Sequence, residues 1–339
     1  MKNYMKKALS VFATALFAIS VSACGHSSST DGNAASSGSG QLKTVAVSTN
    51  PFIGNGALYV AMDQGFFEKH GLKVELKEFD SPSQSVAALM AGQVQVTIGT
   101  LDSQMIAADQ NQNAISVIGV QDSSAGADGI LAKSGIASIA DLKGKTIGAP
   151  KGETSGLLLE YALQKNNMTM KDVTLQDMGA SDAGAAFMAG KLDAAVTWEP
   201  YLSNAKKSNA GSIIFSSADA PNVIADVIVV SKKEASKTDN EWISAYLDAI
   251  QDGLDYINDP KTKAQAFQII AAQLGISADE AKAQYKGVKT FSKGDMKKAL
   301  ENGGAIEKTM DFVNKIYVGN GLIHTAITPK DLLNASFIR

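Results

Sequence analysis

The feature that most constrains the fold of this chain is an internal repeat. Residues 88–96 read ALMAGQVQV, and residues 186–194 read AFMAGKLDA, an offset of 98 residues. In each copy the pattern predicts a helix that ends at a glycine, Gly92 or Gly190, and leads directly into a strand. The repeat predicts two similar α/β domains. A chance likeness between two helix ends rich in alanine, glycine and methionine is the alternative.

Short apolar strands alternate with amphipathic helices from Leu42 to Ser231. This alternation predicts an α/β fold with largely parallel sheets. Residues 57–69 are expected to form one helix, and Gly71 suits the left-handed residue that ends it. After Ser231 the pattern becomes all-helical. Strands are expected at residues 44–48, 73–79, 94–100, 115–120, 129–132, 146–149, 173–177, 194–198, 212–215 and 226–231.

Residues 1–24 have the pattern of a secretory signal. A basic start precedes an apolar run of about 14 residues, whereas a membrane-spanning helix needs about 20. The run ends in Val21-Ser22-Ala23-Cys24, which resembles the lipobox of bacterial lipoproteins, and Cys24 is the only cysteine. We expect a lipid on Cys24 and a flexible Ser/Gly-rich tether over residues 25–41. An ordinary signal peptide with an incidental cysteine is the alternative.

The charge balance excludes some partners. The net charge is −3, from 31 basic and 34 acidic residues, and Arg339 is the only arginine. Charges this balanced and dispersed argue against nucleic acid as a partner and against a domain that lies on a membrane surface. The roughly 300 residues after the tether are enough for two domains with substantial cores.

Several motifs, in this order, resemble the nitrate/sulfonate/taurine (NitT/TauT) type of ABC transporter solute-binding lipoprotein. Residues 58–72 (LYVAMDQGFFEKHGL) and 87–94 (AALMAGQV) are similar to the first lobe of that family. Residues 139–148 (IADLKGKTIG) and 182–200 (DAGAAFMAGKLDAAVTWEP) are similar to its second lobe. The resemblance covers about residues 45–230.

The resemblance implies the type II periplasmic-binding-protein fold. That fold has two lobes, each a mixed, mostly parallel sheet flanked by helices, and here a helical C-terminal tail. Lobe 1 is expected over residues 42–123 plus 225–339, and lobe 2 over residues 124–224. The two crossing segments would fall near residues 122–129 and 218–227.

The implied function is that of an extracytoplasmic receptor. It would close around a small molecule and deliver it to an ABC permease and ATPase. We expect a monomer without cofactor or metal, anchored by Cys24 at the extracellular face of the cell membrane or in the periplasm. The family also contains pyrimidine synthases of thiamine biosynthesis, but their cysteine-rich metal motif is missing here. A sensor or adhesion lipoprotein that kept the fold is a further alternative.

Two kinds of ligand fit the polar residues near strand ends. Hydroxyls at helix starts, with Lys151, suit a sulfonate, taurine or nitrate, although an arginine fork is missing. Carboxylates, among them Asp122, favour a small nitrogenous or cationic ligand such as a guanidine, urea or amine. Structural alternatives remain: Asp102, Asp182 and Glu199 could stabilise helix dipoles, hydroxyls at helix starts could be caps, and Trp198 could pack within a lobe. The expected ligand-binding residues are Asn55, Ser83, Thr100, Asp102, Ser123, Asp128, Thr154, Ser155, Asp182, Trp198, Glu199 and Asp226.

Overall fold

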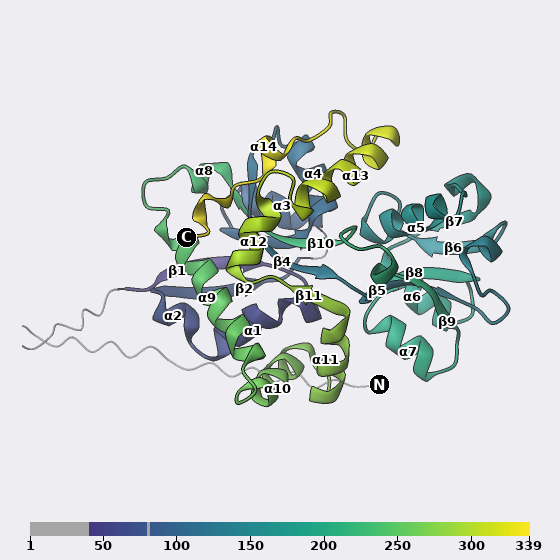
Figure 1. Cartoon of the computed structure of the whole chain (residues 1–339), viewed down its shortest axis with the longest axis horizontal. Coiled ribbons are helices and arrows are strands. Elements are labelled where there is room, and N and C mark those ends of the chain that lie inside the picture. Colours follow the sequence, from purple (N-terminus) through teal and green to yellow (C-terminus); the bar gives the residue numbers. More distant parts are fainter. Residues whose placement is uncertain (1–40, 80–81) are drawn as a thin grey trace, which may run out of the picture. The chain divides into compact units, whose positions relative to one another are not determined.

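The computed structural model describes residues 41–79 and 82–339. Within these ranges the chain forms two β-sheets, each flanked by helices (Figure 1). The expected signal, the tether and Cys24 lie outside the described residues, apart from residue 41. None of the helices described there combines the length and apolar character that crossing a membrane requires.

The first sheet has the strand order β11-β4-β10-β3-β1-β2. β1 pairs in parallel with β2 and β3, whereas β10 is antiparallel to β3 and β4, and β11 is antiparallel to β4. Strands β1 to β4 therefore run in one direction, and β10 and β11 run in the opposite direction. The strands are β1 (Lys43–Ser48), β2 (Leu72–Lys77), β3 (Val96–Thr100), β4 (Ile115–Ser124), β10 (Ala225–Ser231) and β11 (Val288–Thr290).

The second sheet has the order β7-β6-β8-β5-β9. β6 is parallel to β7 and β8, and β5 alone is reversed, antiparallel to β8 and β9. Both sheets are therefore mixed, and most strands of each point the same way. This confirms the predicted two-lobed α/β fold; the first lobe is built on the first sheet and the second lobe on the second. The strands are β5 (Asp128–Ala132), β6 (Thr146–Ala149), β7 (Thr174–Asp177), β8 (Ala194–Trp198) and β9 (Ser212–Ser216).

The helices correct one prediction. Instead of one helix over residues 57–69, the chain forms two, because Gly65 adopts the left-handed conformation (φ 69°) between them. Gly71 is left-handed (φ 79°), as predicted. The helices are α1 (Gly56–Asp63), α2 (Phe66–Lys69), α3 (Pro82–Met90), α4 (Leu101–Gln110), α5 (Thr154–Lys165), α6 (Ala180–Met188), α7 (Tyr201–Lys207), α8 (Lys232–Ala235), α9 (Glu241–Asn258), α10 (Lys263–Leu274), α11 (Ala278–Gln284), α12 (Lys293–Leu300), α13 (Ala305–Gly319) and α14 (Pro329–Leu332).

The internal repeat corresponds to the same local structure in both lobes. α3 and α6 end two residues before Gly92 (φ 72°) and Gly190 (φ 76°), which are both left-handed. The N–H of Gly92 donates to the carbonyl of Leu89 at 3.0 Å, and that of Gly190 donates to Phe187 at 2.8 Å. β3 and β8 then follow. A helix, a glycine turn and an inner strand therefore recur in each sheet.

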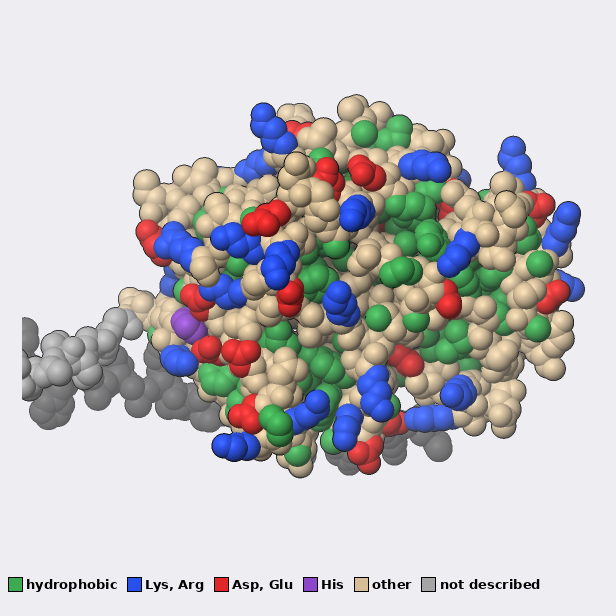
Figure 2. Space-filling model, viewed as in Figure 1, with side chains coloured by type: hydrophobic (Ala, Val, Ile, Leu, Met, Phe, Trp, Pro, Cys, Tyr) green, Lys and Arg blue, Asp and Glu red, His purple; other side chains and the backbone are tan. Residues whose placement is uncertain are grey.

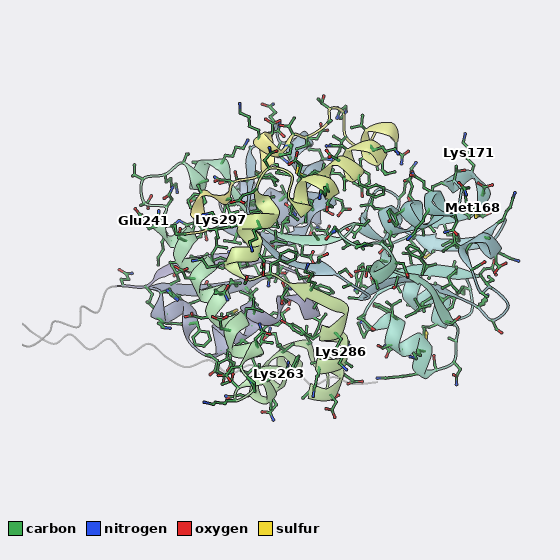
Figure 3. All side chains as sticks on the ribbon, viewed as in Figure 1. Met168, Lys171, Glu241, Lys263, Lys286 and Lys297 are labelled. Carbon is green, nitrogen blue, oxygen red and sulfur yellow. The ribbon has the colours of Figure 1, made fainter. Side chains whose placement is uncertain are left out.

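Charged side chains lie on the outside of this framework. Lysines and carboxylates of both signs are interspersed on the face shown in Figure 2. Lys171, Lys263 and Lys297, which are labelled in Figure 3, are exposed. Long charged side chains keep their ends in water, so this dispersed pattern follows from burial of the apolar helix faces.

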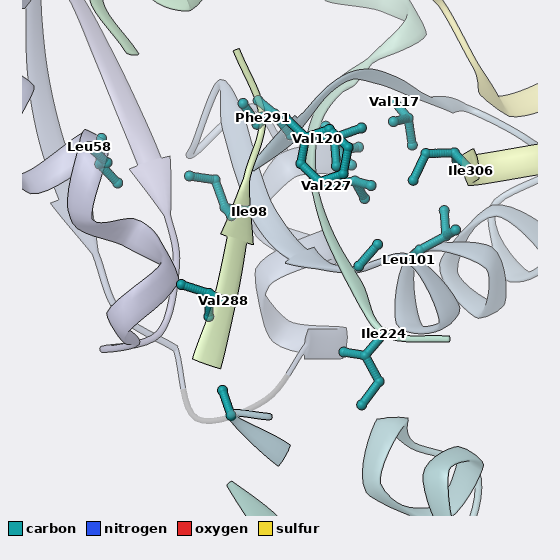
Figure 4. Packing of buried hydrophobic residues seen from close by; sticks show 14 of the residues in the cluster. Leu58, Ile98, Leu101, Val117, Val120, Ile224, Val227, Val288, Phe291 and Ile306 are labelled. Carbon is teal, nitrogen blue, oxygen red and sulfur yellow. The ribbon is translucent and has the colours of Figure 1, made fainter. Parts of the chain in front are cut away.

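β11 corrects the expectation that the chain is all-helical after Ser231. It pairs with the end of β4, with Lys289 opposite Ser123. Val288 on this strand and Phe291 just beyond it are buried and lie in the core of the first lobe with Ile98 (Figure 4). Three residues are too few for an alternating pattern to be recognised in a sequence.

The connections between the sheets are shorter than expected. β4 continues through Asp122 to Ser124 because it pairs with both β10 and β11, so only residues 125–127 connect it to β5. Ser123 Oγ donates to the carbonyl of Ile224, on the returning segment, at 3.0 Å. The carbonyl of Gly287 accepts from Ala125 and Ala127 at 2.7 and 3.1 Å. Gly287 therefore contacts the connecting segment 125–127. A Cβ at Gly287 would lie 2.9 Å from the Ala127 nitrogen, so this close approach requires glycine.

Candidate ligand-binding site

Four polar residues form one row across the first sheet, at the end where the chain crosses to the second. Asp226 lies directly opposite Asp122 on one side and opposite Thr100 on the other, and Asp122 lies opposite Thr290. Residues directly opposite one another in adjacent strands project from the same face. Two carboxylates therefore lie side by side, an arrangement that destabilises a sheet unless something else compensates.

Two further carboxylates complete the group, one on each lobe. Asp128 begins β5, and Asp102 lies in the first turn of α4. Asp102, Asp122 and Asp128 are 3%, 1% and 6% exposed, and Asp226 is partly buried. We call these four residues the carboxylate cluster. Across the described ranges none of the four forms an ion pair with a lysine, a histidine or the single arginine.

Burial and mutual repulsion both favour the neutral form of this cluster. Burial raises the pKa of Asp128 to about 6; a hydrogen bond from Ser124 opposes this, and the charge of Asp102 adds to it. Burial, then the charges of Asp128 and Asp102, raises the pKa of Asp226 to about 7. Burial, then Asp226 and Asp128, holds the pKa of Asp122 well above its usual range. A cation placed among them would reverse these shifts.

Both oxygens of Asp102 have hydrogen-bond partners. Thr154 Oγ1, at the start of α5 in the second lobe, is 2.9 Å from Oδ1. The hydroxyl of Tyr317, from α13, donates to Oδ2 at 2.8 Å. Thr154 Oγ1 is also 2.8 Å from Thr100 Oγ1, which lies 2.9 Å from Ser103 Oγ. Asp102, Thr154 and Thr100 therefore join the two lobes directly.

Several predicted residues have structural partners. Asn55 is buried, and its Nδ2 donates to Thr49 Oγ1 at 2.9 Å and to the Asn50 carbonyl at 2.8 Å. Glu199 accepts from the backbone N–H and the hydroxyl of Ser203 at 3.0 and 2.7 Å, and so caps the start of α7. Ser123 holds the crossing segment described above. Each of these three side chains therefore has a hydrogen-bonding partner within the described part of the chain.

The remaining predicted residues lie in different elements, some of them next to the cluster. Trp198 is partly buried and lies opposite Asp128 in the β5–β8 ladder. Ser155 is 1% exposed, and its hydroxyl has no hydrogen-bond partner among the described residues. Asp182 is exposed in the first turn of α6. Ser83 lies in α3, but its side chain is outside the described part of the chain.

Sequence reasoning missed Tyr317 and Gln121. Tyr317 belongs to an amphipathic C-terminal helix, where a buried tyrosine has the same pattern as any core aromatic. Gln121 follows the predicted end of the fourth strand, and no sequence signal extends that strand. Both residues become visible only when the first sheet is assembled.

Two cavities lie elsewhere, among the helices of the first lobe. One, of about 350 Å³, lies between α1 and α10 and is lined in part by Tyr59, Met62 and Ile269. The other, of about 360 Å³, lies beside α2 and α9 and is lined in part by Phe66 and Tyr256. Neither is lined by a residue predicted to bind ligand. Within the described residues, no group of three or more histidine, cysteine or acidic residues could hold a metal ion.

Comparison with known proteins identifies the family. A family model described as "NMT1/THI5 like" matches residues 54–263, so the chain belongs to this family. This family, together with sulfonate-binding relatives and structural neighbours, supports the nitrate/sulfonate/taurine type of ABC transporter solute-binding protein, which confirms the resemblance seen in the sequence motifs.

Two relatives span most of the chain. It is 25% identical over 280 residues to a protein of Brucella abortus (strain 2308) named as a binding protein, covering 82% of this chain and 86% of that one. It is 27% identical over 297 residues to a protein of Brachyspira hyodysenteriae (strain ATCC 49526 / WA1) named as an ABC transporter periplasmic binding protein, covering 83% and 85%.

Solved structures share the fold. The periplasmic aliphatic sulphonate binding protein SsuA from Escherichia coli superposes with a TM-score of 0.72 at 19% identity, covering 86% of this chain and 92% of that one. The desulfurization enzyme DSZB has a TM-score of 0.65 at 15% identity, covering 87% and 97%. A receptor and an enzyme thus share this architecture, so the fold alone does not determine function.

Proposed function

We propose that this protein is an extracytoplasmic receptor that binds a small nitrogenous or cationic compound, such as a guanidine, urea or amine, and delivers it to an ABC permease and ATPase. The carboxylate cluster carries the proposal. Asp122, Asp128 and Asp226 lie where the chain crosses between the lobes, buried wholly or in part, and no cation pairs with them in the described structure.

The physical basis is the cost of burying charge. A buried carboxylate is retained only when it is protonated, paired with a cation or fully hydrogen-bonded. An ammonium, guanidinium or amidinium ligand supplies both the positive charge and several N–H donors, and bonds between charged groups are stronger than neutral ones. Closure of the lobes around such a ligand would bring Asp128 of the second lobe and Asp226 of the first onto it together.

A sulfonate, taurine or nitrate is the second candidate, and the family relationship favours it. The hydroxyls of Thr100, Ser103 and Thr154 gather at the lobe contact and could donate to an anion. The same place holds Asp102, however, which would repel an anion. With arginine confined to position 339, a guanidinium fork for the anion is also missing.

The receptor role is also proposed in preference to an enzymatic one. His70 Nε2 lies 3.0 Å from Asp252 and His324 Nδ1 lies 2.7 Å from Asp109, so each histidine contacts a carboxylate that is outside the cluster. We further propose a lipid anchor on Cys24 and a monomeric receptor at the outer face of the membrane. The mixed charges in Figure 2 support the absence of a nucleic-acid partner.

Isothermal titration calorimetry of the purified protein at pH 8 tests the proposal. The compounds are guanidine, urea, methylamine, taurine, ethanesulfonate and nitrate. We expect a cation to bind, and Asp226→Asn to weaken it at least tenfold, equivalent to about 1.4 kcal/mol. Asp252→Asn, a carboxylate of the first lobe paired with Lys69 and His70, is the control. Binding of a sulfonate or nitrate that is as strong or stronger in Asp226→Asn would refute the cationic ligand.

A further inference from the structure

An irregularity in β4 places two polar side chains at the same point. Asp226 pairs with Asp122, but Val227 pairs with Val120, so Gln121 is the extra residue of a β-bulge. A bulge turns a side chain away from the regular alternation. Gln121 Nε2 donates to the carbonyl of Gly54 at 3.3 Å. The carboxylate of Asp122 also packs against Gly54.

Gly54 makes room for the Asp122 carboxylate. A Cβ on Gly54 would lie 2.0 Å from Asp122 Oδ2 and 2.7 Å from Cε1 of Phe52. The carboxylate and the edge of the Phe52 ring therefore both pack against Gly54. Phe52 is partly exposed, whereas Asp122 and Gln121 are 1% and 4% exposed.

Three acceptor atoms at this point have no donor within the described chain. They are Oδ1 and Oδ2 of Asp122 and Oε1 of Gln121. Buried polar atoms are nearly always hydrogen-bonded, so these three acceptors on the two residues that contact Gly54 are open to a group that carries donors. When Asp122 is ionised all three are acceptors, and a group that carries N–H donors and a positive charge would satisfy them together.

We infer that Phe52, Gly54, Gln121 and Asp122 form the seat for a planar cation bearing N–H donors, a guanidinium or amidinium group. This rests on the proposed function, because it specifies the chemical class within nitrogenous and cationic ligands. A guanidinium presents two parallel N–H bonds to a carboxylate and can direct a third to the Gln121 oxygen. A quaternary ammonium has no N–H, so it would leave all three acceptors unsatisfied.

Calorimetry with three probes of similar size separates these classes. At pH 8 we expect methylguanidinium to bind, tetramethylammonium to bind at least 100-fold more weakly, and neutral methylurea at least tenfold more weakly. Asp122→Asn and Gln121→Leu should each lower the methylguanidinium affinity at least tenfold, because each keeps the side-chain size but removes an acceptor.

Gly54→Ala should have the same effect by displacing the Asp122 carboxylate. Gly319→Ala is its control, because a Cβ there meets nothing within 4 Å. If Gly54→Ala does not fold, the nearly isosteric Asp122→Asn carries the test, with circular dichroism to confirm its fold.

The outcomes distinguish this inference from the proposed function. If Asp226→Asn abolishes methylguanidinium binding while Asp122→Asn and Gln121→Leu leave it unchanged, the seat is wrong and the cationic receptor stands. Equal binding of tetramethylammonium and methylguanidinium also overturns the seat alone. If only sulfonates or nitrate bind, both proposals fail.

Discussion

Replacement of Asp128 by asparagine should stabilise the ligand-free protein at neutral pH and leave it unchanged in acid. Asp128 is 6% exposed at the start of β5, and burial raises its pKa to about 6. Asparagine has the same shape and can accept the hydrogen bond from Ser124, but it carries no charge to bury.

The magnitude follows from linkage between protonation and folding. The carboxyl of Asp128 has a usual pKa of 3.8 and a folded pKa of about 6. One pKa unit corresponds to about 1.4 kcal/mol, so a shift of about two units is worth about 3 kcal/mol. Between pH 4 and 6 the folded state holds a proton that the unfolded state has lost. The unfolding free energy of the parent therefore falls as the pH rises from 4 to 6. Above pH 6 the parent retains the full destabilisation of about 3 kcal/mol from the buried charge of Asp128.

Urea unfolding of parent and variant at pH 4, 6 and 8 measures this difference. We expect near equality at pH 4 and an advantage of about 3 kcal/mol for Asp128→Asn at pH 8. Asp252→Asn provides a control of opposite sign. Burial tends to raise the pKa of Asp252, but hydrogen bonds from Lys69 and His70 outweigh it and lower that pKa. This control should be less stable than the parent at pH 8. An Asp128→Asn variant that gains nothing between pH 4 and pH 8 would refute the reasoning.

Three further predictions concern the lobe contact, the repeat and the membrane anchor. Thr154→Val removes the hydroxyl that contacts Thr100. Calorimetry should show a ligand Kd about fivefold higher, equivalent to about 1 kcal/mol. An unchanged Kd would mean that this contact does not contribute to closure. Gly92→Ala and Gly190→Ala each place a Cβ on a left-handed residue. Each should lower the unfolding free energy by about 1–2 kcal/mol in urea titrations. An effect at one site only would show that the two turns are not equivalent. Cys24→Ser should abolish labelling of the expressed protein by radioactive palmitate and release it from membranes; persistent labelling would contradict the lipobox assignment.

Much of the secondary structure could be predicted because its causes are local. Apolar residues at a spacing of two or of three to four set the strands and helices, and Gly92 and Gly190 end helices wherever the chain places them. For this reason the ten predicted strands are all present, several with shifted ends. The fold class followed from their alternation with helices. Errors arose where a local pattern was too short, at β11, or was interrupted by one backbone angle, at Gly65.

The carboxylate cluster could be predicted only in part. Asp102, Asp128 and Asp226 were recognised because acidic residues near strand ends are visible in a sequence. That Asp122 lies directly opposite Asp226 depends on the register between β4 and β10, strands separated by about a hundred residues. The sequence alone could not separate these residues from Glu199, which has the same local setting but is satisfied by Ser203.

The sequence by itself determined the elements, the fold class and the family, since each depends on residues near one another along the chain. Only the tertiary structure decided which acidic groups are buried together and which polar atoms are left without partners. It also decided that Tyr317 reaches Asp102 across 215 positions. The physical reason is that burial and pairing are properties of the assembled sheets, and a carboxylate's charge state depends on every group packed around it.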